Sequence, residues 1–328
     1  MVFSIVSGSK YMNLESSKYP STCIAILNWN GIKHLKHLLP TVLKATSNYW
    51  DSCPIIVLDN QSTEPDQSWL ATHYPEIEMV IAPENDYLFS YNWLLGSRKE
   101  EVVILLNNDL RVDENFIVPL LRHFSETSVF AVSARAYDWN GVKITSGPSL
   151  FQQHRGWFHC GFDTSRQYAC YTLFACGGYM AVDRKKFLEL GGFDRLFFPA
   201  YGEDLDLGYR AWCRQWKSIY EPASIVYHRE RGSWDANGDK RSSRLILQAQ
   251  FLFQWRNLRQ WNFQLKHKLY LPWLWFRQWL RGNKIWLEVY DDAKNIWKKQ
   301  KNQALKNTHS QIDLNFLKKM VGEPISRE

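Results

Sequence analysis

Short apolar runs alternate with segments of helical spacing over the first hundred residues of the chain. Between the first two runs, apolar residues recur at intervals of three and four from Ile32 to Leu43, as on one face of a helix. The four runs span residues 22–27, 54–58, 78–81 and 102–106. Continuous apolar strands that alternate with helices indicate an α/β fold whose mostly parallel sheet is covered on both faces.

The regular alternation fades after Ala134 and resumes at about residue 171. A strand within 171–182 and a helix over 184–190 are expected, followed by a helix from Glu203 to about Trp216. Two short strands are expected around Ile219 and over 225–227. The aromatic insertion HRGWFHCGF, at residues 154–162, is consistent with an acceptor-site loop and equally with a surface loop packed by its own aromatic side chains.

Polar residues follow three of the predicted strands. Ligands of parallel α/β sheets bind beyond the carboxyl ends of the strands, where the sequence places Asn28, Asp59 and the run Asn107, Asn108 and Asp109. Mg²⁺ or Mn²⁺ takes one or two protein carboxylates and fills its other positions with phosphate oxygens and water, a role open to Asp109. Taken alone, each of these residues is better explained by ordinary turn chemistry.

A second group of candidates lies at the start of the helix near residue 203. Asp204 either caps that helix or acts as a general base, with Glu203 beside it raising its pKa by like-charge repulsion. Asp206 is expected to face elsewhere on the helix. His228 ends a later strand and suits a metal site, while Arg229 and Arg231 suit a diphosphate.

In their order along the chain, these segments resemble glycosyltransferase family 2, including its rhamnosyltransferase-like bacterial members. The resemblance covers about residues 20–234. It is carried by the motifs LNWNG, LDNQS, LLNND, GGFD, GEDLDLGYRAW and VYH. Each motif is weak alone, but the six in this order form a specific pattern.

The resemblance implies a GT-A fold and an inverting glycosyltransferase that uses a nucleotide-diphosphate sugar and a divalent cation. By position in the motifs, Asp59 is expected to contact the base and Asp204 to be the catalytic base. Asp109 and His228 are expected at the metal. A glycine-rich stretch of the family is replaced here by ENDYLFSYNW, so Asn92 is expected to line a reshaped donor pocket.

Charge is distributed unevenly along the chain. The net charge is +7, but residues 229–328 alone hold 20 Lys or Arg against 9 Asp or Glu, together with 8 of the 16 tryptophans. We expect a polar tail over 1–19, a GT-A domain over 20–234 and a helical, basic and aromatic extension over 235–328. Basic residues interleaved with aromatic ones indicate an anionic surface as partner, and no nucleic-acid-binding module is recognisable.

Within 251–286 the aromatic residues have two interpretations. They suit an interfacial helix on a membrane, with Trp at the boundary of water and acyl chains, or a helical extension packed on the catalytic domain or on a second subunit. The first interpretation predicts a cytoplasmic enzyme, peripheral on the inner face of the membrane, with a glycan or lipid-linked acceptor. No apolar stretch reaches the roughly 18 residues of a spanning helix.

Two other functions remain open. A sugar-phosphate nucleotidylyltransferase would need a glycine-rich basic loop after the first strand, and LNWNGIKHL supplies none. A catalytically degenerate GT-A domain would serve as a membrane-associated binding module. The presence of Asp109, Asp204 and His228 favours an active enzyme instead.

Overall fold

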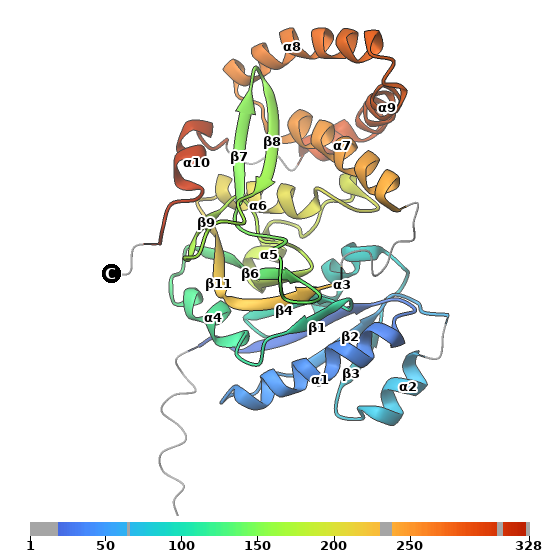
Figure 1. Cartoon of the computed structure of the whole chain (residues 1–328), viewed down its shortest axis with the longest axis vertical. Helices are drawn as coiled ribbons and strands as arrows, with labels where there is room; N and C mark the ends of the chain where they lie inside the picture. The colour runs from blue at the N-terminus through green and yellow to red at the C-terminus, as the bar shows by residue number, and fades with distance from the viewer. Residues whose placement is uncertain (1–18, 64–65, 230–237, 307–310, 326–328) are drawn as a thin grey trace, which may run out of the picture.

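The computed structural model describes residues 19–63, 66–229, 238–306 and 311–325 (Figure 1). In these residues nine strands form one sheet of order β3-β2-β1-β4-β10-β6-β11-β5, with β9 paired to β11, and β7 and β8 form a separate hairpin. The strands are β1 Thr22–Asn28, β2 Ile55–Asp59, β3 Glu78–Ile81, β4 Val102–Asn107, β5 Leu110–Val112, β6 Val129–Asp138, β7 Ser149–His154, β8 Trp157–Phe162, β9 Cys170–Thr172, β10 Tyr179–Asp183 and β11 Lys217–His228.

Six of the nine sheet strands run in one direction. β3, β2, β1 and β4 are parallel, β10 runs antiparallel between β4 and β6, and β6 and β11 are again parallel. The expected mostly parallel sheet of a GT-A fold is therefore confirmed. The two short strands expected around Ile219 and over 225–227 are in fact one strand, β11, with a register shift between Glu221 and Ile225.

Helices lie on both faces of this sheet, and others pack beyond it. They are α1 Ile32–Asn48, α2 Asp66–His73, α3 Ser90–Ser97, α4 Ile117–Leu121, α5 Arg184–Glu189, α6 Glu203–Cys213, α7 Gly238–Asn257, α8 Trp261–Leu280, α9 Lys284–Lys306 and α10 Leu314–Met320, with 3-10 turns at Tyr87–Phe89, Arg122–Ser125 and Arg195–Phe197. The 3-10 turn at Tyr87–Phe89 leads directly into α3, and α6 ends three residues earlier than expected.

The two faces of β1 show why its sequence is apolar throughout. Ile24 and Ile26 belong to one buried cluster, with α1 and α4, whereas Cys23 and Ala25 belong to a second cluster on the opposite face. Side chains alternate between the faces of a strand, so a strand covered twice has no polar face. In the view of Figure 1, α1 lies below the sheet and α6 and α7 lie above it.

The aromatic insertion at residues 154–162 is a hairpin arm, which corrects both expectations of a loop. β7 and β8 pair in antiparallel register and project from the sheet toward α8 (Figure 1). Trp157 and Phe158 are buried against α7, with ring centroids 5.1 Å from Phe251 and 4.8 Å from Phe253, respectively. The arm therefore supports the C-terminal helices.

The C-terminal extension is helical, as expected, and its first helix shares the core of the preceding residues. Phe251, Leu252 and Phe253 of α7 are fully buried in the same apolar cluster as Leu207 and Tyr209 of α6. The expected domain boundary after residue 234 lies outside the described residues. No helix in the described part of the chain is both long and apolar enough to cross a bilayer.

A buried ionic network fixes α6 to α7. Asp206 is completely buried; it accepts hydrogen bonds from Arg210 Nε at 2.7 Å and Asn257 Nδ2 at 2.8 Å, and Arg256 Nε lies 3.1 Å away. Burial alone would raise the pKa of Asp206, but the charges of Arg210 and Arg256 outweigh it and lower that pKa. Arg256 also pairs with Asp194. Asp206 therefore faces away from Asp204, as expected.

Asp206→Ala should lower the free energy of unfolding by about 3–5 kcal/mol, because it leaves two buried guanidinium groups without their shared carboxylate. Urea unfolding followed by circular dichroism measures the change. Glu288→Ala is the control, since it breaks an ion pair with Arg244 that is largely exposed and should cost less than about 1 kcal/mol. A similar small effect of both substitutions would contradict the structural role of Asp206.

Candidate functional site

A buried polar network joins the carboxyl ends of β1, β2 and β4. Asn108 Nδ2 donates to Asn28 Oδ1 at 2.9 Å, and Asn28 Nδ2 donates to Asp66 Oδ2 at 2.7 Å and to Asp59 Oδ1 at 3.3 Å. Each of these four residues is at most 8% exposed. The candidates that the sequence placed after separate strands are therefore brought together, and Asp66 joins them.

Gly31 is required by this network. A Cβ atom at this position would lie 2.1 Å from Asn108 Nδ2 and 2.2 Å from Asn28 Oδ1. The backbone N–H of Gly31 donates to Asp66 Oδ2 at 2.8 Å. Only glycine lets the chain approach the two amides this closely before α1 begins. Its place in LNWNG was the available sequence signal for this role.

The side chain of Asp59 is completely buried in this conformation. Its carboxylate accepts hydrogen bonds from Ser62 Oγ at 2.5 Å and Ser62 N at 3.0 Å, besides that from Asn28, and no part of the residue is exposed. The expected contact of Asp59 with a nucleobase stays a prediction, and in this conformation its carboxylate orders the strand ends. The Asp-x-x-Ser spacing explains this, because it forms an Asx-type turn.

Asp109 and His228 meet at the edge formed by β5 and β11. His228 Nε2 lies 3.5 Å from Asp109 Oδ2, and the backbone N–H of Arg229 donates to the backbone oxygen of Asp109 at 3.0 Å. β11 pairs antiparallel with β5, with His228 opposite Leu110. Residues 119 positions apart are thus brought together by the register of two strands.

These two side chains fit one side of a divalent-cation site. Asp109 Oδ1 is buried and has no hydrogen-bond partner among the described residues. A buried carboxylate oxygen without a partner is costly, and a cation would satisfy it. Within the described residues no three His, Cys, Asp or Glu side chains cluster for a metal. This is consistent with a cation that takes few protein ligands and completes its shell with phosphate and water.

Arg229 is held beside Asp109 by an aromatic ring. Its guanidinium lies over the ring of Trp139, 4.4 Å from the centroid, and Arg111 lies over the same ring, also at 4.4 Å. This cation–π contact directs Arg229, for which the described residues provide no acidic partner. Arg231, the other expected diphosphate ligand, lies outside the described residues.

Two glycines connect Asn107 to Asp204. The backbone N–H of Asn107 donates to Gly178 O at 2.8 Å, and its side chain lies so close to Gly178 that a Cβ there would be 2.7 Å from Asn107 Nδ2. The N–H of Gly177 donates to Asp204 Oδ2 at 3.3 Å. The segment before β10 therefore places the start of α6 next to the end of β4. Neither glycine was predicted as a site residue, although the Gly-Gly pair is visible in the sequence.

The turn before α6 is held from the C-terminal side. Gly202 has φ +87° and precedes Glu203; a Cβ on it would lie 2.8 Å from Ala249 Cβ of α7 and 2.9 Å from the ring of Phe197. Any larger residue would be strained in this left-handed conformation and would clash with both neighbours. The position of Asp204 thus depends on α7.

The acid pair at the start of α6 is electrostatically asymmetric. Burial raises the pKa of Glu203, and the charge of Asp204 raises it further. Burial also raises the pKa of Asp204, but the N–H groups of Gly177 and Leu205 stabilise its carboxylate and limit that rise. Asp204 is partly exposed, whereas Glu203 is 8% exposed and its Oε2 has no hydrogen-bond partner among the described residues. The expected repulsion therefore acts mainly on Glu203.

The amide of Asn92 is hydrogen-bonded within the fold, and its expected place in the donor pocket stays a prediction. Its Nδ2 donates to the backbone oxygen of Phe193 and its Oδ1 accepts from the backbone N–H of Phe193, both at 2.8 Å. A Cβ on Gly192 would lie 2.2 Å from the same Oδ1. The amide of Asn92 thus fixes the Gly192–Phe193 turn from α3, and we assign it this structural role.

One known protein of similar sequence covers about half of this chain. A putative polypeptide N-acetylgalactosaminyltransferase 10 of Drosophila melanogaster is 23% identical over 196 residues, which are 53% of this chain and 30% of that protein. The chain thus spans less than a third of that relative's length.

Two solved structures share the fold. GalNAc-T7 with UDP, GalNAc and Mn²⁺ superposes with a TM-score of 0.57 at 17% identity, over 72% of this chain and 50% of that chain. The mannosyltransferase PcManGT from Pyrobaculum calidifontis with GDP-Man and Mn²⁺ gives 0.55 at 14% identity, over 87% and 76%. The family model "Glycosyl transferase family group 2" matches residues 102–289, more than half of the chain. The chain therefore belongs to glycosyl transferase family group 2.

Proposed function

We propose that this protein transfers a sugar from a nucleotide-diphosphate donor to an acceptor hydroxyl, with inversion at the anomeric carbon. One observation carries the proposal: a carboxylate suited to a cation, Asp109, and a partly exposed carboxylate suited to general base catalysis, Asp204, lie at one edge of the sheet, connected through Asn107, Gly178 and Gly177. Glycosyl transfer needs both groups, one near the leaving diphosphate and one near the attacking hydroxyl.

The solved neighbours support the donor class. GalNAc-T7 was solved with UDP and GalNAc, PcManGT with GDP-Man, and both with Mn²⁺. A nucleoside diphosphate and a divalent ion are common to the two. We carry this shared chemistry to the present chain, and we propose Mg²⁺ or Mn²⁺ as its cofactor.

Asp109 and His228 would hold the cation, and Arg229 would contact the diphosphate beside it. The bound cation would neutralise the negative charge that develops on the leaving diphosphate. Asn107 and Asn108 adjoin Asp109 at the end of β4, where Asn108 is fixed by Asn28 and Asn107 by the Gly178 backbone. The protein therefore presents a preorganised edge to the donor.

Asp204 would take the proton from the acceptor hydroxyl. Its Oδ2 is oriented by the N–H of Gly177 and its Oδ1 by the N–H of Leu205 at 2.8 Å, so the ionised form is favoured enough to accept a proton. Glu203, with the more strongly raised pKa, stays neutral while Asp204 ionises. A neutral Glu203 adds no further negative charge beside an anionic donor.

We also propose that the protein acts at an anionic membrane surface, on a glycan or lipid-linked acceptor. The support comes from the C-terminal part, where α8 combines seven highly exposed apolar side chains with Lys and Arg. In this respect α8 differs from α7, because the aromatic residues of α7 are mostly buried in the core. Surface polysaccharide or lipid-linked glycan synthesis fits such a location.

Asp109→Ala should abolish Mn²⁺-dependent binding of the nucleotide-sugar donor. The cation would lose its carboxylate, and the diphosphate would lose the cation that neutralises it. A thermal-shift screen of nucleotide sugars, with and without Mn²⁺, measures this because a ligand of the folded state raises the melting temperature. An equal Mn²⁺-dependent shift in Asp109→Ala, or full turnover in excess chelator, would refute the assignment.

Asp204→Asn should retain donor binding and reduce kcat by about 10²–10⁴, because only the proton acceptor is lost. The control is Asp183→Asn, which changes a partly buried helix cap far from the proposed chemistry and should keep kcat. If Asp204→Asn retains most of its kcat, or if only donor binding suffers, Asp204 is not the base. If the wild type shows neither transfer nor donor hydrolysis, the protein is a degenerate binding module.

The pH dependence of kcat/KM should have an acid limb above the ordinary aspartate pKa of 3.8, because burial raises the pKa of Asp204 and only its ionised form accepts a proton. Activity should therefore increase with pH through this limb. Glu203→Gln should leave the limb in place, since Glu203 is still protonated there. The raised pKa also means that ionisation of Asp204 opposes folding, so its stabilising neutral form is lost as the pH rises. A limb at or below pH 3.8 would contradict this environment.

A further inference from the structure

One face of α8 carries a stripe of largely exposed apolar side chains. At about 100° per residue, its members fall within an arc of about 120°. The stripe consists of Trp261, Leu265, Leu269, Trp273, Phe276, Trp279 and Leu280, each between 44% and 79% exposed. Phe263, His267 and Leu274 lie on the opposite side of the helix and are buried. The exposed stripe is therefore not needed to attach α8 to the protein.

Cations border this stripe, and α8 contains no Asp or Glu. By the same helical geometry, Lys268 lies at one edge of the stripe and Lys266 and Arg277 lie at the other. An apolar face flanked by Lys and Arg is typical of helices that lie in the plane of an anionic membrane. A soluble protein partner would be matched by mixed charges instead.

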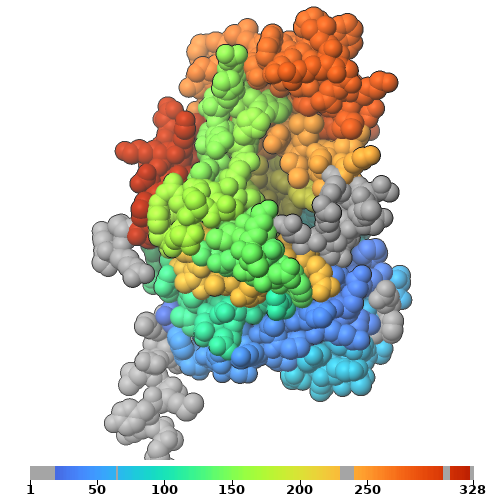
Figure 2. All heavy atoms as spheres, viewed as in Figure 1, coloured from blue at the N-terminus to red at the C-terminus, as the bar shows by residue number. Residues whose placement is uncertain are grey.

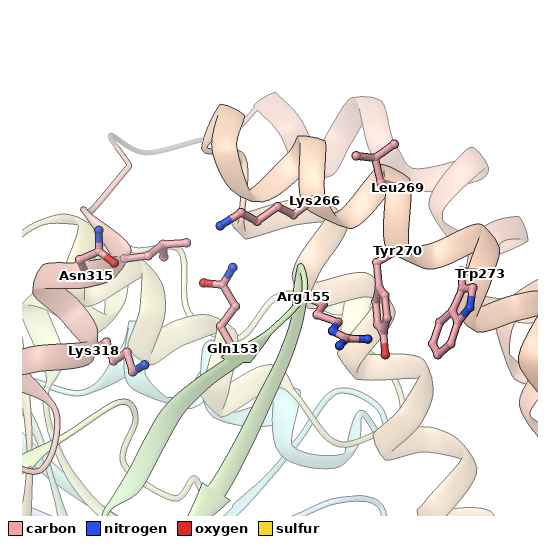
Figure 3. A pocket seen from close by; sticks show the side chains of 9 residues that line it. Gln153, Arg155, Lys266, Leu269, Tyr270, Trp273, Asn315 and Lys318 are labelled. Atoms are coloured by element: carbon pink, nitrogen blue, oxygen red, sulfur yellow. The ribbon is translucent and has the colours of Figure 1, made fainter.

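A basic cavity of about 860 Å³ adjoins the stripe between α8, α10 and the tip of the β7–β8 hairpin (Figure 3). Its cations come from three separate elements: Arg155 from the hairpin tip, Lys266 from α8 and Lys318 from α10. Among the residues that the structure describes, no acidic one lines this cavity. Leu269 and Trp273 belong to both the cavity wall and the stripe. The cavity therefore suits an anion joined to an apolar group.

The hairpin tip is fixed to α8, so Arg155 is held in place at this cavity. His267 Nδ1 lies 2.8 Å from Gly156 O and therefore donates, while Trp255 Nε1 donates to His267 Nε2 at 3.2 Å. Gly156 has φ +79°, and a Cβ on it would lie 2.4 Å from the backbone nitrogen of His267. Only glycine permits this approach. The cavity is thus a built feature of the fold.

We infer that this cavity binds the phosphate headgroup of an anionic bilayer lipid while the α8 stripe enters the adjoining acyl region. The inference rests on the proposed membrane location and assigns it a site and a ligand class. A free phosphate would use the three cations but would leave the stripe in water. A bilayer lipid satisfies both, because its phosphate and its chains are adjacent.

Vesicle co-sedimentation of the full chain tests this inference. Wild type should bind vesicles of phosphatidylglycerol and phosphatidylcholine, and should bind phosphatidylcholine alone weakly. Replacing Arg155, Lys266 and Lys318 together by Gln should weaken binding on the order of 100-fold, because each cation near an anionic surface contributes about one factor of five. Leu269→Ser with Leu280→Ser should also weaken binding by reducing the inserted apolar area.

The matched control replaces Lys298, Lys299 and Lys301 by Gln. These exposed residues of α9 carry the same total charge but line neither the cavity nor the stripe. The control should lose less than about fivefold. An equal loss would show general charge attraction and overturn the site. Absence of wild-type binding at low salt would overturn it too.

Two further outcomes distinguish other occupants. Displacement by inorganic phosphate, at an ionic strength where sodium chloride has no effect, would assign the cavity to a free phosphate and overturn the lipid. A dimer in solution that dissociates with Leu269→Ser would assign the stripe to a second copy. Donor-dependent thermal shifts separate this inference from the transfer chemistry: the cavity variant should retain them, whereas Asp109→Ala should lose them and still bind vesicles.

Discussion

The arrangement of the candidate site depends on the complete burial of one charge. Asp206 has no contact with water, so its carboxylate must be balanced inside the protein, and Arg210 of α6 and Arg256 of α7 provide that balance. The network joins the helix that carries Asp204 to the first helix of the C-terminal part. Together with the close contact of Gly202 and Ala249, it fixes where α6 begins. The basic extension therefore contributes to the candidate site as well as to the far end of the molecule.

Several carboxyl groups lie close together in the candidate site, and they differ in burial and in hydrogen-bond partners. Asp59 and Asp66 are held by hydrogen bonds among the strand ends, and Glu203 remains neutral through burial and the charge of its neighbour. Asp109 retains an oxygen without a partner among the described residues, which suits a cation, and Asp204 stays partly exposed. Different degrees of burial and different partners thus give these carboxyl groups different electrostatic environments.

The hairpin arm connects the catalytic part to the end of the molecule that carries the α8 stripe. Its strands lie on α7 through Trp157 and Phe158, and its tip is bonded to α8 through Gly156 and His267 (Figures 1 and 2). Figure 2 shows α8 and α9 at the opposite end of this face from α1 and α2. An enzyme seated on a membrane through α8 would therefore keep most of its sheet in the aqueous phase.

The sequence by itself determined the fold class and the chemistry of most candidates, because apolar strand runs and short polar motifs are local features. The strands of the first half, the helix at Glu203 and the candidates Asp109, Asp204 and His228 followed from such patterns. Only the tertiary structure showed that Asn92 binds the backbone of Phe193, 101 residues away, and that Asp59, besides its local turn with Ser62, accepts from Asn28, 31 residues away. It also decided that Gly177 and Gly178 place Asp204 beside Asn107, and that the aromatic residues of the extension divide between core and surface. These outcomes depend on close approach between distant segments, which no local pattern of residues specifies.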